Sequence, residues 1–115
     1  MIDLRGNKLI LEIVGFVLAF MIGACIANGI PHYTKGVTGQ SHMTVFSKLS
    51  SPIVNVLWGL FNWLLAFILY LVFNSLIDNF TNLHIIIALA GGVFISLRLA
   101  KLWSDPNAKL PWHKE

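Results

Sequence analysis

Hydrophobic residues along the chain gather into three long runs that are separated by polar segments. The runs cover about residues 9–27, 53–77 and 84–102. Each is close to, or longer than, the ~20 apolar residues that an α-helix needs to cross the hydrocarbon core of a bilayer. The pattern therefore predicts an all-α membrane protein, a three-transmembrane-helix bundle.

The polar segments supply the predicted ends of these helices. Asn28 and Gly29 tolerate the left-handed backbone that often ends a helix, so we expect the first helix to stop there. A structured interfacial loop, 28–51, would follow it. Ser51 and Pro52 would then start the second helix, as a hydroxyl N-cap followed by a first-turn proline.

Two further segments complete the predicted architecture. The short polar segment 77–83 predicts that the second and third helices are antiparallel neighbours, because it contains only a few residues. The tail 103–115 contains Pro106 and Pro111, so it is not expected to be helical throughout. Trp103, at the start of the tail, is typical of an aromatic anchor at the level of the lipid headgroups.

Small side chains recur about every fourth position within the hydrophobic runs, which places them on one face of each helix. In membranes such faces let two backbones approach closely, because packing rather than hydrophobicity drives helix association. We therefore expect a compact bundle held together at these positions. The predicted packing residues are Gly15, Ala19, Gly23, Gly59, Ala88, Gly92 and Ser96.

The composition supports a membrane location. Hydrophobic residues make up 57% of the chain and charged residues only 11%, whereas a soluble domain carries roughly 25% charged residues. So few charges cannot cover a water-exposed surface, and one membrane domain is expected over residues 1–115. The net charge of +3 comes from residues at the ends of the apolar runs and not from a basic cluster. It therefore favours lipid headgroups over nucleic acid as a partner.

Lysine and arginine are divided unequally between the two predicted sides of the membrane. Arg5 and Lys8 lie on the side of the N-terminus, and the other six lie with the loop 28–51 and the C-terminus. An excess of Lys and Arg marks the cytoplasmic face. We therefore expect a protein of the inner cell membrane, with the N-terminus outside and the loop and C-terminus in the cytoplasm.

A second interpretation of residues 1–27 leaves this orientation open. Their basic start, apolar run and small residues also resemble a signal peptide, and the sequence from Ile22 to Cys25 fits a bacterial lipoprotein cleavage site. Cleavage would leave Cys25 lipidated outside and reverse the topology. Glu12 interrupts the apolar run, however, and the small-residue face continues through the cleavage site, which favours a membrane-spanning helix.

Several polar groups are predicted to meet at the cytoplasmic boundary. The candidate ligand-binding residues are His32, Asn55, Trp58, Asn62 and Arg98. An imidazole in such a place can bind a quinone oxygen, ligate a metal or shuttle a proton. Each polar residue also has a structural interpretation. The asparagines can bond another helix or a loop carbonyl, Arg98 can reach lipid phosphates, and His32 can hold the loop through a backbone carbonyl.

The sequence shows no arrangement typical of a catalytic or metal site. The four histidines lie at spacings that complete no metal-ligand pattern, and the loop 28–51 contains no carboxylate. The segment 36–39 lacks the lysine and helix of a phosphate-binding loop and is typical of a turn. We therefore predict no catalytic residues, no metal and no cofactor.

The loop and the start of the second helix resemble a family of small bacterial integral membrane proteins. That family shares N-G-x-P-H, G-x-x-G and T-P-F-like elements and an S-P-x-x-N-x-L-W-G helix start. Val45 stands where the pattern has proline. The resemblance implies a bacterial multi-span protein and implies no activity. The matching residues are Asn28, Gly29, Pro31, His32, Gly36, Gly39, Thr44, Phe46, Ser51, Pro52, Asn55, Leu57, Trp58 and Gly59.

The function predicted from these features is non-enzymatic. We expect a small integral membrane protein of structural or interaction type, which forms a homo-oligomer or joins a larger membrane-protein complex among membrane lipids. The alternative is a module or enzyme component that binds a lipid, quinone or similar amphiphile at the interface through residues 28–59. The two differ in whether the candidate residues surround an open cavity or only bond the loop.

Overall fold

The computed structural model describes residues 4–114, with side chains for residues 6–114. It contains three α-helices: α1 (Leu4–Val37), α2 (Pro52–Leu76) and α3 (Asn82–Trp103). All three are long and apolar enough to cross a membrane. The only strand-like pairing in the described part is a single bridge between His42 and Ser50. The predicted all-α, three-span fold is confirmed.

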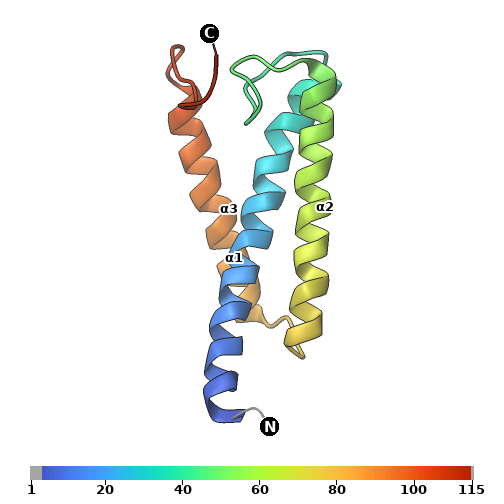
Figure 1. Cartoon of the computed structure of the whole chain (residues 1–115), viewed down its shortest axis with the longest axis vertical. Coiled ribbons are helices and arrows are strands. Elements are labelled where there is room, and N and C mark those ends of the chain that lie inside the picture. Colours follow the sequence, from blue (N-terminus) through green and yellow to red (C-terminus); the bar gives the residue numbers. More distant parts are fainter. Residues whose placement is uncertain (1–3, 115) are drawn as a thin grey trace.

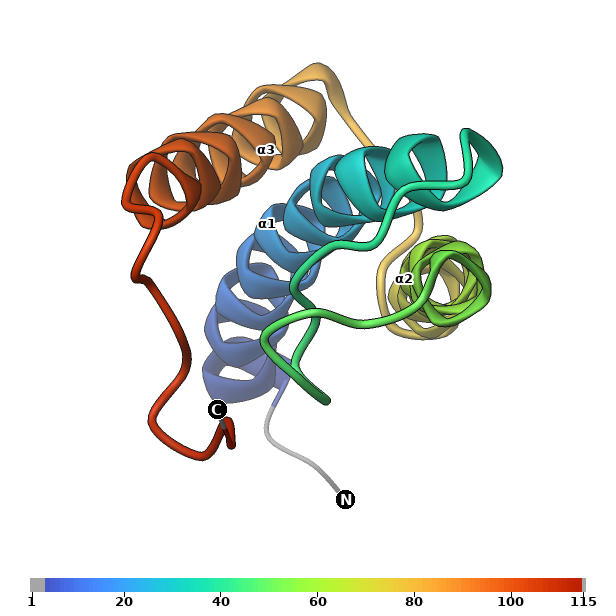
Figure 2. The same cartoon turned by 90° about the horizontal axis from the view of Figure 1, so that it is seen from above.

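Helix α1 lies between the other two helices (Figure 1, Figure 2). It packs along both α2 and α3, whereas α2 and α3 meet near their connection, where the rings of Phe73 and His84 lie 4.8 Å apart. The two outer helices are antiparallel, as expected, but they do not lie side by side along their length, because α1 separates them. The connection 77–81 is long enough to cross the width of α1, since five extended residues reach about 17 Å.

Helix α1 continues well past its predicted end at Asn28 and includes Pro31. Proline removes one backbone donor from a helix, and membrane helices tolerate this because neighbouring groups satisfy the freed carbonyls. Pro31 frees the carbonyl of Ala27, and the indole nitrogen of Trp63 donates to the adjacent carbonyl, that of Ile26, at 3.1 Å. The structured loop is therefore 38–51, shorter than the predicted 28–51.

The true end of α1 is a glycine cap at Gly39, which has a φ of 76°. The Gly39 amide donates to the Gly36 carbonyl at 3.0 Å, and the Gln40 amide donates to the Lys35 carbonyl at 2.9 Å. This pair of bonds is the Schellman arrangement, which satisfies the last carbonyls of a helix and needs a residue that tolerates positive φ. The predicted turn at 36–39 is therefore part of the helix cap.

The starts of the other two helices follow side-chain capping rules. The Ser51 hydroxyl accepts from the Val54 amide at 3.2 Å, as predicted for the start of α2. Helix α3 begins with a capping box that sequence reasoning missed, in which Thr81 and His84 exchange side-chain and backbone bonds. Here a histidine takes the place that Glu or Gln usually holds.

Small residues set the close approach of α1 to its neighbours. A Cβ at Gly23 would collide with the backbone of Ala88 in α3, and one at Gly91 would collide with the backbone of Phe20. Toward α2, a Cβ at Gly59 would lie 2.7 Å from the Tyr33 nitrogen. The small-residue faces therefore pack against other helices of the same chain.

Most of the predicted packing positions take part in these contacts. Gly15 and Ala19 are buried. A Cβ added at Gly92 would lie 3.5 Å from the Gly23 carbonyl oxygen, which is an ordinary van der Waals contact. Ser96 is exposed, so it is not a packing position within this chain. The C-terminal half of α3 diverges from α1 toward the end that carries the loop (Figure 1).

The loop 38–51 and the tail 104–114 lie together at one end of the helices (Figure 1). The Trp112 indole donates to the Val45 carbonyl at 2.6 Å, and His113 Nε2 lies 2.7 Å from the Thr44 carbonyl oxygen. We call these two segments the cap. The cap lies opposite the described start of α1, so the two groups of basic residues lie at opposite ends, as the sequence predicted.

We expect Gly23→Ala to destabilise the protein, because the new methyl group would force α1 away from the Ala88 backbone. Overpacking of this kind costs about 1–3 kcal/mol. Gly92→Ala is the matched control, because its Cβ meets only ordinary contacts and alanine favours a helix by about 1 kcal/mol over glycine. Thermal unfolding in mild detergent checks the pair, and equal midpoints for the two variants would contradict this packing.

Candidate functional site

The side chain of Asn55, in the first turn of α2, is the centre of the polar network under the cap. It is fully buried, with 0% exposure. Its Nδ2 donates to the carbonyls of His42, Ser50 and Ser51 at 3.0, 3.1 and 3.0 Å. The two hydrogens of one amide group are thus shared among three backbone oxygens, each of which also accepts a backbone hydrogen bond, and this ties the loop to the start of the helix.

The same side chain fixes the protonation of His32. Because Asn55 Nδ2 faces three carbonyls, its Oδ1 must be the end that lies 3.0 Å from His32 Nδ1. An amide oxygen can only accept, so His32 Nδ1 carries the proton and donates it. His32 is 3% exposed. The structure thus brings His32 and Asn55 together, as predicted. Through the bonds of Asn55 to the loop carbonyls, the pair fixes the loop against α1 and α2.

The loop also closes on itself above Asn55. His42 and Ser50 exchange both backbone hydrogen bonds, at 3.0 and 2.9 Å. The Ser50 hydroxyl lies 2.6 Å from the Thr44 hydroxyl and 2.8 Å from the Ser47 hydroxyl. Thr44 and Ser50 are both buried. The cap therefore has a fixed internal structure.

Three rings form a cluster beside this network. His32 meets Trp103 edge-on with ring centroids 5.5 Å apart, and His42 lies 5.7 Å from His32. His42 and Trp103 are closest, with centroids 4.1 Å apart. We call this the His32–His42–Trp103 cluster. It joins α1, the loop and the last residue of α3, so it fixes the position of the cap against two helices.

Two nitrogens of this cluster have no hydrogen-bond partner. His42 Nε2 and Trp103 Nε1 are both buried without one, among the residues that the structure describes. Leaving a buried polar group unpaired costs about 1–3 kcal/mol. Such groups are rare in folded proteins and call for an explanation.

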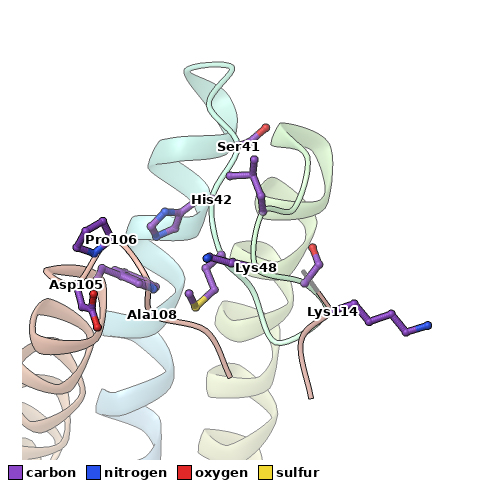
Figure 3. Close-up of a pocket in the computed structure, with 11 residues that line it drawn as sticks. Ser41, His42, Lys48, Asp105, Pro106, Ala108 and Lys114 are labelled. Carbon is purple, nitrogen blue, oxygen red and sulfur yellow. The ribbon is translucent and has the colours of Figure 1, made fainter. Parts of the chain in front are cut away.

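Two cavities adjoin the cluster. The outer cavity, of about 570 Å³, opens between the loop and the tail and is lined by His42, Lys48, Trp103 and Lys114, among others (Figure 3). The inner cavity, of about 160 Å³, lies deeper between the helices. Met43 and Trp103 line both.

The other predicted site residues serve different purposes. Asn62 accepts from Asn28 at 3.0 Å and donates to the Trp58 carbonyl at 2.8 Å, which joins α1 to α2. Trp58 stacks on Phe61 at 5.5 Å with an interplanar angle of 15°, and it also lines the inner cavity. The Asn28–Asn62 bond connects the two helices, whereas the contacts of Trp58 with Asn62 and Phe61 lie within α2.

Arg98 does not join the other candidates. It is exposed on α3 and lines neither cavity. Sequence reasoning also missed two members of the cluster, His42 and Trp103. His42 lies in a loop without periodicity, and Trp103 has the ordinary signature of a membrane anchor, so no local pattern pointed to either as a site residue.

Burial lowers the pKa of the His42 imidazole below its usual range, and repulsion from Lys35 and from His32 when that ring is protonated lowers it further. His42 is therefore uncharged at neutral pH. In His113, Nδ1 accepts from the Leu110 amide at 3.1 Å and Nε2 donates to the Thr44 carbonyl. The positive charge beside the outer cavity comes from lysines.

Within residues 4–114, no three His, Cys, Asp or Glu side chains are grouped so that they could hold a metal ion. Comparisons with protein-family models, with curated proteins and with solved structures found no match. The resemblance of the loop to a bacterial membrane family therefore stays a prediction.

We expect Asn55→Asp to release the loop while leaving the helices in place. The change keeps an acceptor for His32 but turns a carboxylate oxygen toward the three carbonyl oxygens that Asn55 Nδ2 now bonds. The lost hydrogen bonds and the repulsion between oxygens cost at least about 2 kcal/mol. Limited proteolysis within 38–51, with helix content followed by circular dichroism, measures this. The equivalent change in the exposed turn, Asn79→Asp, should have no effect. A loop that stays protected in Asn55→Asp would contradict the network.

We expect acid to destabilise the cap through His42. In the unfolded chain this group binds a proton near its usual pKa of about 6.5, whereas the folded environment resists protonation. Stability is therefore greatest above that value and falls as the pH drops below it. Thermal midpoints between about pH 7.5 and about pH 5.5 should fall less in His42→Phe than in the native protein, and equal slopes would refute this.

Proposed function

We propose that this chain is a non-enzymatic integral membrane protein that presents the cap as a recognition surface at the membrane boundary. The observation that carries the proposal is the set of hydrogen bonds that the Asn55 side chain makes. Its amide bonds three carbonyls and His32, all within the chain. The most deeply buried polar group of the predicted site therefore serves to order the cap and is not free to bind a substrate.

Membrane lipids are the proposed surroundings of the helices. Large apolar side chains are exposed along α2 and α3, including Leu57, Leu64 and Phe67 on α2 and Leu89 and Leu97 on α3. In lipid such side chains need no partner, because the helices satisfy their own backbone groups. We propose the inner membrane of a bacterium, with the N-terminus outside and the cap in the cytoplasm, from the lysine and arginine excess at the cap end.

The surface that joins this chain to another protein is proposed to be the cap. The small-residue faces were the expected site of assembly, but they are occupied by contacts of α1 with α2 and α3. Contact between copies, or with a larger complex, therefore requires another surface. The cap combines fixed backbone geometry with exposed groups such as Phe46, Leu49 and Trp112, and exposed aromatic residues are enriched where proteins associate.

Native mass spectrometry of the protein, extracted in mild detergent from its own membranes, tests this proposal. We expect one discrete homo-oligomer or one reproducible protein partner. Asn55→Asp should lose that assembly because it releases the loop, and Asn79→Asp should retain it. A protein-free monomer for the native chain, or an assembly that survives Asn55→Asp with a released loop, would refute the role of the cap.

A further inference from the structure

The outer cavity has the chemistry of an anion site. Lys48 and Lys114 line it, and Asp105 is the one acid among its lining residues. Figure 3 shows the Lys48 side chain reaching from the loop toward His42, whereas Lys114 extends away from the other labelled residues. Because His42 is neutral, Lys48 is the cation placed to meet a ligand beside the cluster.

The position of the cavity suits a molecule of the membrane surface. Trp103 lines it and is the last residue of α3. A span of this length ends at the headgroup level, where lipid phosphates lie. Aromatic residues such as Trp103 concentrate at the same depth. The open side of the cavity therefore meets the phosphate layer.

The unpaired nitrogens of the cluster call for acceptors. An indole nitrogen can only donate, so Trp103 Nε1 requires an acceptor, and His42 Nε2 can donate to one as well. Both side chains line the outer cavity. Phosphate oxygens accept several hydrogen bonds and carry the negative charge that an ammonium group attracts. One phosphate group can thus pair with the Lys48 ammonium and accept hydrogen bonds from Trp103 Nε1 and His42 Nε2.

The inner cavity adds a largely apolar extension. It shares Met43 and Trp103 with the outer cavity and continues among Leu99, Leu102 and Leu110, with Asn28, His32 and Thr44 as its polar lining residues. A cationic chamber that is backed by leucine side chains matches a molecule with an anionic head and a hydrocarbon chain. A free anion would leave the leucine-lined part unused.

We propose that the outer cavity binds the phosphate headgroup of an anionic membrane lipid, with Lys48 and Trp103 as its contacts and an acyl chain directed toward the inner cavity. This goes beyond the proposed recognition role of the cap, and its two headgroup contacts were not among the predicted ligand-binding residues, although His32 and Trp58 line the inner cavity. Arg98 takes no part, and Asn55 acts only by holding the loop that carries Lys48.

The test uses the full chain, purified in an uncharged detergent and titrated separately with phosphatidylglycerol, phosphatidylcholine and inorganic phosphate. Native mass spectrometry counts bound lipid, and thermal unfolding follows stabilisation. We expect a single phosphatidylglycerol per chain, held about tenfold more tightly than phosphatidylcholine. Lys48→Gln should abolish this preference, and Trp103→Phe, which keeps a ring but removes the donor, should weaken it.

Lys101→Gln is the matched control, because it removes the same charge from an exposed residue of α3 that does not line the cavity. It should keep the preference. Equal binding of the two lipids, or equal losses in Lys48→Gln and Lys101→Gln, would overturn the proposal. Stabilisation by inorganic phosphate as large as that by phosphatidylglycerol would overturn the lipid assignment and make the site one for a soluble phosphate.

Discussion

The buried amide of Asn55 is the interaction on which the cap depends. At the end of a membrane helix, loop carbonyls face an apolar surrounding in which an unpaired group is costly. Three of them accept a backbone hydrogen bond and also a bond from Asn55, which holds them in one place and pairs with His32 of α1. The loop can therefore fold down onto the helices, which brings His42 against Trp103 and lets the tail bond to Thr44 and Val45.

The second constraint is the small size of the side chains on the two packing faces of α1. Because glycine and alanine let its backbone meet both neighbours, α1 can occupy the middle of the molecule and separate α2 from α3 along most of their length. With 34 residues it is about 51 Å long, which exceeds a hydrocarbon core of about 30 Å. Its N-terminal end projects beyond the α2–α3 connection in Figure 1, so part of the excess lies outside the bundle.

The separation of α2 and α3 has a consequence at the cap end. At this end α2 and α3 do not pack together, so a space is left between them below the loop. Side chains of the loop and the tail, together with Trp103, partly fill that space. Closure is incomplete, which leaves the inner and outer cavities and the unpaired nitrogens of the cluster. The ordering role of Asn55 and the proposed lipid site are thus two results of one arrangement.

Local patterns were enough to predict three spans, the helix N-cap at Ser51 and most of the packing positions. Span length, helix capping and helical spacing all depend on residues near one another in the chain. Asn28 and Gly29 were misleading as a helix end. Asn28 pairs with Asn62 and Gly29 packs beside Gly59, so tertiary contacts keep the helix going as far as the glycine cap at Gly39.

The pairing of His32 with Asn55 followed from folding the chain back, since both were expected at one membrane boundary. The place of α1 between its neighbours, the His32–His42–Trp103 cluster and the isolation of Arg98 could not be derived in that way. They depend on which face of each helix meets which partner, and on how a loop without periodicity folds. Only packing across the whole chain decides these contacts, because no spacing within one segment records them.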